Sequence, residues 1–215
     1  MTPKAVLFDC DGVLVDSEPL GLALLQDDLA RHGFAITMDE IHAGWVGMTI
    51  SGVADKARKL GAALPPDWTD RHYALLYHRL AEGIPLIPGV EDLLDRLDAA
   101  GISYAVGSNG TRRKMEITLS QHPRVWPRLK DHLHSGQELA RPKPDPALYL
   151  NAAADLGVAP GDCVVVEDSA PGCRAGVAAG MRTLGLARHD DGARLAAEGA
   201  EVFHSMDDLP ARLGF

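Results

Sequence analysis

Residues 4–18 read KAVLFDCDGVLVDSE, and this stretch joins a short apolar run to a group of acids. The run ends at Phe8 and meets Asp9 and Asp11, which are two positions apart. In extended backbone such side chains project to the same side, and two carboxylates this close repel each other unless a cation or proton lies between them. Gly12 allows a sharp turn directly after the pair. The stretch therefore predicts a buried strand that leads into a charged loop.

Other stretches repeat this pattern, in which an apolar run ends in polar residues. The runs at 104–106 and 164–166 meet polar residues in this way, and 181–187 is a further strand candidate. Continuous apolar strands of this kind are typical of a parallel sheet covered on both faces. Helical patterns lie between them, at residues 90–101, 111–121, 145–156 and 170–180. The alternation predicts an α/β fold with a doubly wound, mostly parallel, Rossmann-like sheet.

One segment, between about residues 17 and 84, interrupts the alternation. Leu22, Leu25 and Leu29 share a helical face there, and the segment has no convincing strand. Its length of about 65 residues is too great for an ordinary crossover. We therefore expect an all-helical cap domain at 17–84, inserted into a catalytic core of residues 1–16 and 85–215. The alternative is that these helices extend the layers of a single domain.

The composition argues against several classes of protein. The 215 residues are 46% hydrophobic and 24% charged, as in ordinary globular domains. A net charge of −9 is the wrong sign for a nucleic-acid or anionic-membrane surface, and no run approaches the ~18 apolar residues of a membrane span. The three cysteines lack paired spacing, and the N-terminus lacks a signal-peptide pattern. We expect a cytoplasmic protein that binds neither nucleic acid nor membranes, and a monomer because no coiled-coil heptad is evident.

The acids that follow the predicted strands are expected to meet at one edge of the sheet. Ligands of open α/β sheets bind beyond the carboxyl ends of the strands, and Asp9, Asp11, Glu167 and Asp168 all follow such ends. Hard oxygen ligands of this kind suit Mg²⁺. Taken singly, each pair could instead be a solvated turn or the start of a helix, where acids are favourable. Gathered together, they would be unstable without a cation.

Two further segments could bind an anion. Ser108, Asn109 and Gly110 precede a helix start, where hydroxyl, amide and backbone N–H groups can cradle a phosphate. Lys143 lies between two prolines that stiffen its loop, so it could neutralise a phosphate or a developing charge. Alone, each segment could equally be an ordinary turn or a solvated loop. The basic residues at 112–114 are interpreted as a solvated helix face rather than as part of the site.

These motifs resemble those of the haloacid dehalogenase superfamily, in its branch of Mg²⁺-dependent phosphohydrolases with a helical cap. The matching stretches are DCDGVLVDSE at 9–18, SNG at 108–110, KP at 143–144 and VEDS at 166–169, in the family's order. The resemblance covers nearly the whole chain. Among close relatives the chain looks most like the sugar-phosphate phosphatases and β-phosphoglucomutase.

The resemblance implies catalysis through an aspartyl phosphate. Asp9 would be the nucleophile, and Asp11 would protonate the leaving oxygen and then deprotonate the attacking water. Lys143 would hold Asp9 and the phosphate in register. An acid at Asp11 argues against the family's dehalogenases and phosphonate-cleaving members, which lack it.

The resemblance also implies a magnesium site and a phosphate site. Mg²⁺ would be held by the Asp9 side chain, the Asp11 backbone carbonyl and the Asp168 side chain. Glu167 would act through a bound water or from behind the ligands. The phosphate would be bound by Ser108, Asn109, Gly110 and Lys143.

The implied substrate is a small phosphorylated metabolite, a sugar or sugar-acid phosphate. Mutases of the β-phosphoglucomutase type present an Arg and a Lys from the cap to hold a second phosphate. Thr49 stands where that Arg would be, and the Lys has no counterpart. The sequence therefore favours a phosphatase, with a phosphohexomutase as the alternative. A non-catalytic binding homologue is disfavoured because every motif carboxylate is present.

Overall fold

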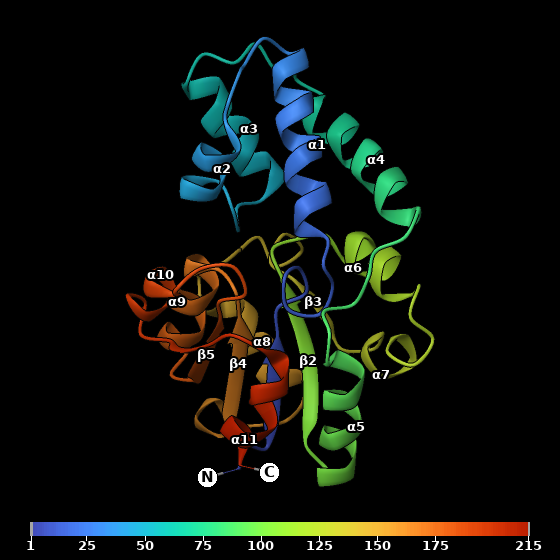
Figure 1. The fold of residues 1–215 in the computed structure, drawn as a ribbon, viewed down its shortest axis with the longest axis vertical. Coiled ribbons are helices and arrows are strands. Elements are labelled where there is room, and N and C mark those ends of the chain that lie inside the picture. Colours follow the sequence, from blue (N-terminus) through green and yellow to red (C-terminus); the bar gives the residue numbers. More distant parts are fainter. Residues whose placement is uncertain (1, 215) are drawn as a thin grey trace.

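The computed structural model describes residues 2–214, which form a parallel sheet flanked by helices, with a group of helices above it (Figure 1). The sheet has six strands in the order β3-β2-β1-β4-β5-β6, and every neighbouring pair is parallel. The strands are β1 (Ala5–Phe8), β2 (Ser103–Ser108), β3 (Leu133–Ser135), β4 (Cys163–Glu167), β5 (Arg182–Leu186) and β6 (Glu201–Phe203). The helices that accompany them are α5 (Val90–Ala100), α6 (Arg112–Leu119), α7 (Trp126–Leu129), α8 (Ala147–Asp155), α9 (Ala170–Ala178), α10 (Ala193–Ala196) and α11 (Leu209–Leu213).

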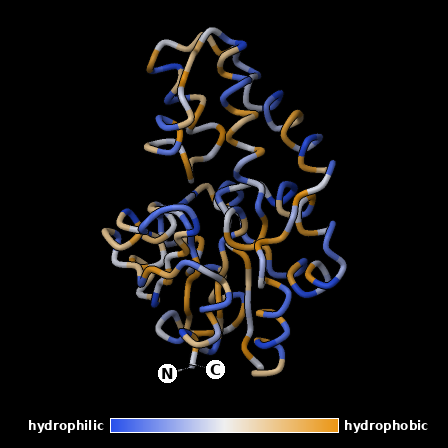
Figure 2. The backbone as a smooth tube through the Cα atoms, viewed as in Figure 1, coloured by the Kyte–Doolittle hydropathy of each residue, from blue (hydrophilic) through white to orange (hydrophobic). Residues whose placement is uncertain are grey.

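Strand β1 shows why the sheet is covered on both faces. Its four residues are all completely buried. Val6 and Phe8 pack into a core with α5 and α11, whereas Ala5 and Leu7 pack into a second core with α8 and α9. Side chains alternate between the two faces of a strand, so a continuous apolar run fills both cores. Figure 2 shows this concentration of apolar residues in the central strands.

The structure confirms the predicted α/β class, the parallel sheet and the helices α5, α6, α8 and α9. Strands β3 and β6 were not predicted; they have only three residues each and lie at the two edges of the sheet. Such strands are too short to show an apolar run of their own. They are identified by their pairing with β2 and β5.

Four helices separate β1 from α5 in the chain and lie beyond the carboxyl ends of the strands (Figure 1). We call them the helical insertion: α1 (Glu18–Arg31), α2 (Met38–Gly44), α3 (Ile50–Lys59) and α4 (Trp68–Ala81). They enclose an apolar core of their own, which includes Leu29, Ile41 and Trp68. The connections that enter and leave the insertion, at Asp16 and Pro85, run side by side. The Asp16 N–H donates to the Pro85 carbonyl oxygen at 2.9 Å.

Within residues 2–214, none of the helices combines the length and the apolar character that crossing a membrane requires.

Candidate active site

Three carboxylates meet at the carboxyl ends of the two central strands. Asp9 follows β1, Glu167 ends β4, and Asp168 comes next in the chain. One oxygen from each of these side chains lies within 4.8 Å of the others. Pairing of β1 with β4 brings the two ends together, and the Asp9 N–H donates to the Val166 carbonyl oxygen at 2.9 Å. The parallel pairing of β1 with β4 therefore brings Asp9, Glu167 and Asp168 together, as predicted.

Lys143 lies inside this cluster, although it is more than a hundred residues from Asp9 in sequence. Its ammonium group donates to Asp9 Oδ1 and Glu167 Oε1, and the residue is only 7% exposed. The peptide bond to the following Pro144 is cis. The Lys143 backbone N–H also donates to Asn109 Oδ1 at 2.7 Å, which ties its loop to the end of β2. Lys143 is thus a fixed cation between two carboxylates.

Glu167 is completely buried, and both of its oxygens have partners. Besides Lys143, the Tyr149 hydroxyl donates to Oε1 at 2.7 Å, and the Ser169 hydroxyl donates to Oε2 at 2.9 Å. A Cβ on Gly172 would lie 1.9 Å from this carboxyl group, so α9 can pack here only with glycine. Tyr149 carried no signal in the sequence, since a tyrosine within an apolar helix resembles ordinary core.

The cluster holds more negative charge than Lys143 balances. Burial raises the pKa of Asp9 to about 7; the charges of Glu167 and Asp11 act in the same direction, while Lys143 opposes them. Burial, followed by the charges of Asp9 and Glu167, also raises the pKa of Asp168 well above its usual range. Hard oxygen donors with unbalanced negative charge fit a divalent cation such as Mg²⁺.

Gly12 is required where the chain turns past Asp168. Its φ is +80°, a conformation in which side chains are strained, and a Cβ there would lie 1.8 Å from Asp168 Oδ2. The predicted sharp turn after the acidic pair is therefore present. Because Gly12 has no side chain, the loop after β1 can pass directly against the Asp168 carboxylate.

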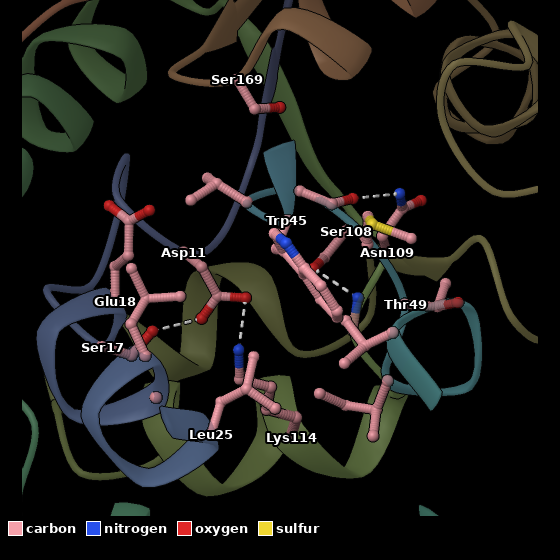
Figure 3. A pocket seen from close by; sticks show the side chains of 18 of the residues that line it. Asp11, Ser17, Glu18, Leu25, Trp45, Thr49, Ser108, Asn109, Lys114 and Ser169 are labelled. Carbon is pink, nitrogen blue, oxygen red and sulfur yellow. Dashed lines mark hydrogen bonds and ion pairs between the residues drawn. The ribbon is translucent and has the colours of Figure 1, made fainter. Parts of the chain in front are cut away.

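Asp11 is held by two donors, Ser17 and Lys114 (Figure 3). The Ser17 hydroxyl donates to Oδ1, and Lys114 Nζ lies 2.7 Å from Oδ2. Burial alone would raise the pKa of Asp11, but the charge and hydrogen bond of Lys114, helped by Ser17, hold it below its usual range. Asp11 is therefore ionised and fixed beside the pocket.

The interpretation of residues 112–114 as a solvated basic face is wrong for Lys114, whereas Arg113 is exposed. The Lys114 side chain is 17% exposed and reaches the site. Arg112 donates to the Leu133 carbonyl oxygen, and Arg113 lies over the Tyr77 ring, 5.0 Å from its centroid. The cap at Thr111, whose hydroxyl accepts from the Lys114 N–H at 3.1 Å, was the available signal. It places position 114 in the first turn of a helix that starts at the strand ends.

The loop after β2 places a free donor and a structural amide at the same edge. Ser108 Oγ accepts from the Gly110 N–H at 2.9 Å, which leaves its own proton to donate elsewhere. The Asn109 side-chain amide instead donates to the carbonyl oxygens of Gly47 and Lys143, at 2.9 and 3.2 Å. Asn109 thus links the helical insertion to the Lys143 loop. Phosphate binding by Ser108, Asn109 and Gly110 stays a prediction.

A pocket extends from these polar groups into the helical insertion (Figure 3). The sheet side contributes charged and polar residues, among them Asp9, Asp11, Lys114, Lys143 and Asp168. The insertion contributes a mainly apolar wall, formed by Leu22, Leu25, Trp45, Val46, Met48, Ile50, Val53 and Leu76. Thr49, the N-terminal cap of α3, also lines the pocket. None of the described lining residues from the insertion is Lys or Arg.

Comparisons with known proteins agree with this geometry. A model of the haloacid dehalogenase-like hydrolases matches residues 3–180. The chain is 32% identical over 211 residues to hexitol phosphatase A of Escherichia coli, covering 97% of this chain and 94% of that protein. It is 35% identical over 204 residues to a CBBY-like protein of Arabidopsis thaliana, covering 85% of this chain but only 62% of that protein's length. A haloacid dehalogenase-like protein of unknown function from Agrobacterium tumefaciens has a solved structure that aligns with a TM-score of 0.83 and 32% identity, covering 98% of this chain and 97% of that one.

Proposed function

Because the chain belongs to the haloacid dehalogenase-like hydrolases, we propose that it is a phosphatase that hydrolyses a sugar or sugar-acid phosphate through a phosphorylated Asp9. The observation that carries the proposal is the position of Asp9. Its carboxylate stands at the carboxyl end of the central strand, between Lys143 and Asp168, at the base of a pocket. Phosphoryl transfer depends mainly on positioning and on neutralising charge, and this arrangement provides both.

Asp9 attacks phosphorus in line in this mechanism, and the ester oxygen leaves. Lys143, fixed on Asp9 Oδ1, orients the nucleophile and offsets negative charge on the transferring group. The Ser108 hydroxyl, whose proton is free, donates to a phosphate oxygen. Water then hydrolyses the phosphorylated Asp9 and restores the carboxylate.

Asp11 moves the protons. It takes up a proton before the first step, donates it to the leaving oxygen, and accepts one from water in the second step. Ser17 and Lys114 hold its carboxylate at the wall of the pocket.

The metal site would be formed by Asp9, Asp168 and the Asp11 backbone carbonyl. A bound Mg²⁺ would neutralise the phosphate oxygens and the acids around them. Glu167, with both oxygens already bonded, supports the site by holding Lys143.

The pocket favours a phosphatase over a phosphohexomutase. A mutase needs cations to hold a second phosphate, and none of the described insertion residues that line the pocket is Lys or Arg. Arg79 of α4 is a cation of the insertion that could have served this purpose. Its Nε instead lies 3.2 Å from Glu82 Oε2 at the surface. The name of the hexitol phosphatase relative points in the same direction.

The helical insertion would be a cap domain with boundaries at 17–84, over a catalytic core of 1–16 and 85–215. The paired connections at Asp16 and Pro85 would serve as its hinge. A monomeric state, a cytoplasmic location and the absence of nucleic-acid partners stay predictions.

The test is to incubate the protein with Mg²⁺ and a panel of sugar phosphates while following phosphorus by NMR. Free phosphate that requires Mg²⁺ and disappears in Asp9→Asn would support the phosphatase. Migration of the signal between two positions of one sugar, with little free phosphate, would indicate the mutase instead. Release of phosphate from none of the panel would contradict both.

A further inference from the structure

The Asn109 side chain joins segments that are far apart in the chain. Its Nδ2 donates to the carbonyl oxygens of Gly47 and Lys143, at 2.9 and 3.2 Å, and its Oδ1 accepts from the Lys143 backbone N–H at 2.7 Å. An amide nitrogen carries two hydrogens, so both donors of this side chain are engaged by the protein. Asn109 lies beside Ser108 at the edge of the pocket (Figure 3), but its amide is occupied by backbone partners.

The first partner, Gly47, belongs to the helical insertion. It lies in the loop between α2 and α3, which also carries Trp45 and Thr49 of the pocket lining. The φ of Gly47 is +80°, and a Cβ there would lie 3.4 Å from the Ser169 side chain. This loop therefore rests directly against the loop that follows β4. The bond from Asn109 to Gly47 can form only when the insertion is seated in this position.

The second partner is the backbone of Lys143, which Asn109 bonds at both its N–H and its carbonyl oxygen. The flanking Pro142 and Pro144 have no backbone N–H, so the Lys143 N–H is the one backbone donor of these three residues. The bond to it fixes the backbone from which the Lys143 ammonium group reaches Asp9. The placement of this cation on the nucleophile therefore depends on Asn109.

A second bonded path reaches Asn109 from α4 of the insertion. Gln137 Nε2 donates to the Tyr73 hydroxyl at 2.7 Å and to the Asn109 carbonyl oxygen at 2.8 Å. Tyr73 lies on α4 and lines the pocket. The insertion is therefore bonded to Asn109 directly through Gly47 and indirectly through Gln137.

We propose that Asn109 is a positioning residue that couples the seating of the insertion to the placement of Lys143, with Gln137 as its brace. When the insertion is seated, Asn109 is held from two sides and keeps the Lys143 ammonium group on Asp9. When the insertion moves away, the bond to Gly47 is lost and the Lys143 loop is held less firmly. The effect on the reaction rests on the proposed phosphatase function, whereas the coupling between the two loops does not.

Hydrogen–deuterium exchange of the full chain without ligand tests the coupling in Asn109→Ala. We expect amides in the peptide 140–147 to exchange at least tenfold faster and those in 44–50 at least threefold faster, while β4 stays unchanged. Prolines occupy positions 142, 144 and 146, so the Lys143 amide is one of few in its peptide and its change is readily resolved. Asn151→Ala, the same change at an exposed position of α8, is the matched control.

Steady-state kinetics with Mg²⁺ and the sugar phosphate that the wild type hydrolyses best test the effect on the reaction. Lys143 offsets negative charge on the transferring group. Its misplacement in Asn109→Ala should therefore lower kcat at least tenfold and leave KM within threefold. A side chain that bound the phosphate of the substrate directly would raise KM instead.

Tyr73 and Tyr77 provide a matched pair for the brace. Their rings stack on α4 with centroids 5.5 Å apart, and the Tyr77 hydroxyl lies 2.6 Å from Thr111 Oγ1 rather than on Gln137. Tyr73→Phe should lower kcat at least threefold and speed exchange of 140–147 at least twofold, whereas Tyr77→Phe should change neither. This pair keeps the coupling testable even if Asn109→Ala fails to fold.

Unchanged exchange of 140–147 and 44–50 in a folded Asn109→Ala protein would overturn the coupling. Faster exchange with an unchanged kcat would overturn its role in the reaction, and a raised KM with normal exchange would mean that Asn109 binds phosphate directly. Equal effects of Tyr73→Phe and Tyr77→Phe would overturn the role of Gln137. Absence of phosphate release by the wild type would contradict the proposed function, while the exchange experiment would still decide the coupling.

Discussion

The two sides of the pocket are built in opposite ways. On the sheet side, Asp9, Asp11 and Lys143 are buried or half-buried charges, and each is bonded to a partner of opposite sign or to a hydroxyl. On the insertion side the wall is mostly apolar, and none of its described lining residues is Lys or Arg.

The difference separates two tasks. Charges that are held by one another before substrate arrives do not have to reorganise during the reaction, which is how electrostatic stabilisation works best. An apolar wall brings no charge to the reaction, so it suits recognition of the rest of the substrate. We therefore assign the chemistry to the sheet side and the choice of leaving group to the insertion.

Asp9→Asn should have the largest effect. An amide is too poor a nucleophile to form the phosphorylated intermediate, so we expect activity to fall below detection with every ester. Phosphate release by a coupled assay measures this, and thermal unfolding checks that the variant is folded. Full turnover in Asp9→Asn would remove the basis for assigning chemistry to the sheet side.

Asp11→Asn should have an effect that depends on the leaving group. For a sugar phosphate the alkoxide needs a proton, so loss of the acid should lower kcat by roughly 10² to 10⁴-fold. 4-Nitrophenolate leaves without one, so formation of the intermediate from that ester should be affected much less. Burst kinetics separate this step from hydrolysis of the intermediate. Equal slowing of the first step for both esters would show that Asp11 does not act as the acid.

The clustering of the acids could be predicted from the sequence because their positions follow from short-range rules. Asp9 and Glu167 directly follow apolar runs, and parallel strands place such ends at one edge. Lys143 and its contact with Asp9 were expected from the resemblance, while its bond to Glu167 came only from the structure.

The remaining features depend on contacts that no local pattern records. Lys114 belongs to a run of three basic residues, and only the helix rotation decides which of them turns toward Asp11. The His72–Asp28 pair joins residues 44 positions apart on two helices. The edge strands β3 and β6 form because neighbouring strands pair with them. The sheet side of the pocket could therefore largely be predicted from the sequence, whereas the apolar wall formed by the insertion could not.

Lys114→Met should change the pH dependence of the reaction, because Lys114 affects the pKa of Asp11. Lys114 lowers the pKa of Asp11 against the effect of burial, so its removal should raise that pKa. Asp11 has to be protonated to act as an acid, so the falling limb of the pH–rate profile should move to higher pH. Lys114→Arg keeps the charge and should keep the limb in place. An unmoved limb in Lys114→Met would mean that another group sets it.

The smallest expected effect is one on the stability of the metal-free protein, in Asp168→Asn. Burial and the charges of Asp9 and Glu167 raise the pKa of Asp168 in the folded protein. The folded state therefore holds this proton more tightly than the unfolded chain, and stability falls as pH rises through the folded-state pKa. Above that pKa, the ionised acid destabilises the metal-free protein, so its removal should raise Tm. In EDTA at pH 8 we expect a gain of about 2–4 °C, which corresponds to about 1 kcal/mol in a chain of this size.

Lower pH and added Mg²⁺ should each remove the advantage of Asp168→Asn, for different reasons. At pH 5 more of the wild-type Asp168 is protonated, so the difference in Tm should shrink. Saturating Mg²⁺ should stabilise the wild type and not the variant, because a ligand that binds only the folded state raises its stability. Asp162→Asn, on the surface before the same strand, is the control and should change Tm little in any buffer. An equal or lower Tm for Asp168→Asn in EDTA at pH 8 would show that the carboxylates are already balanced by Lys143, and the sheet side would then need no metal to be stable.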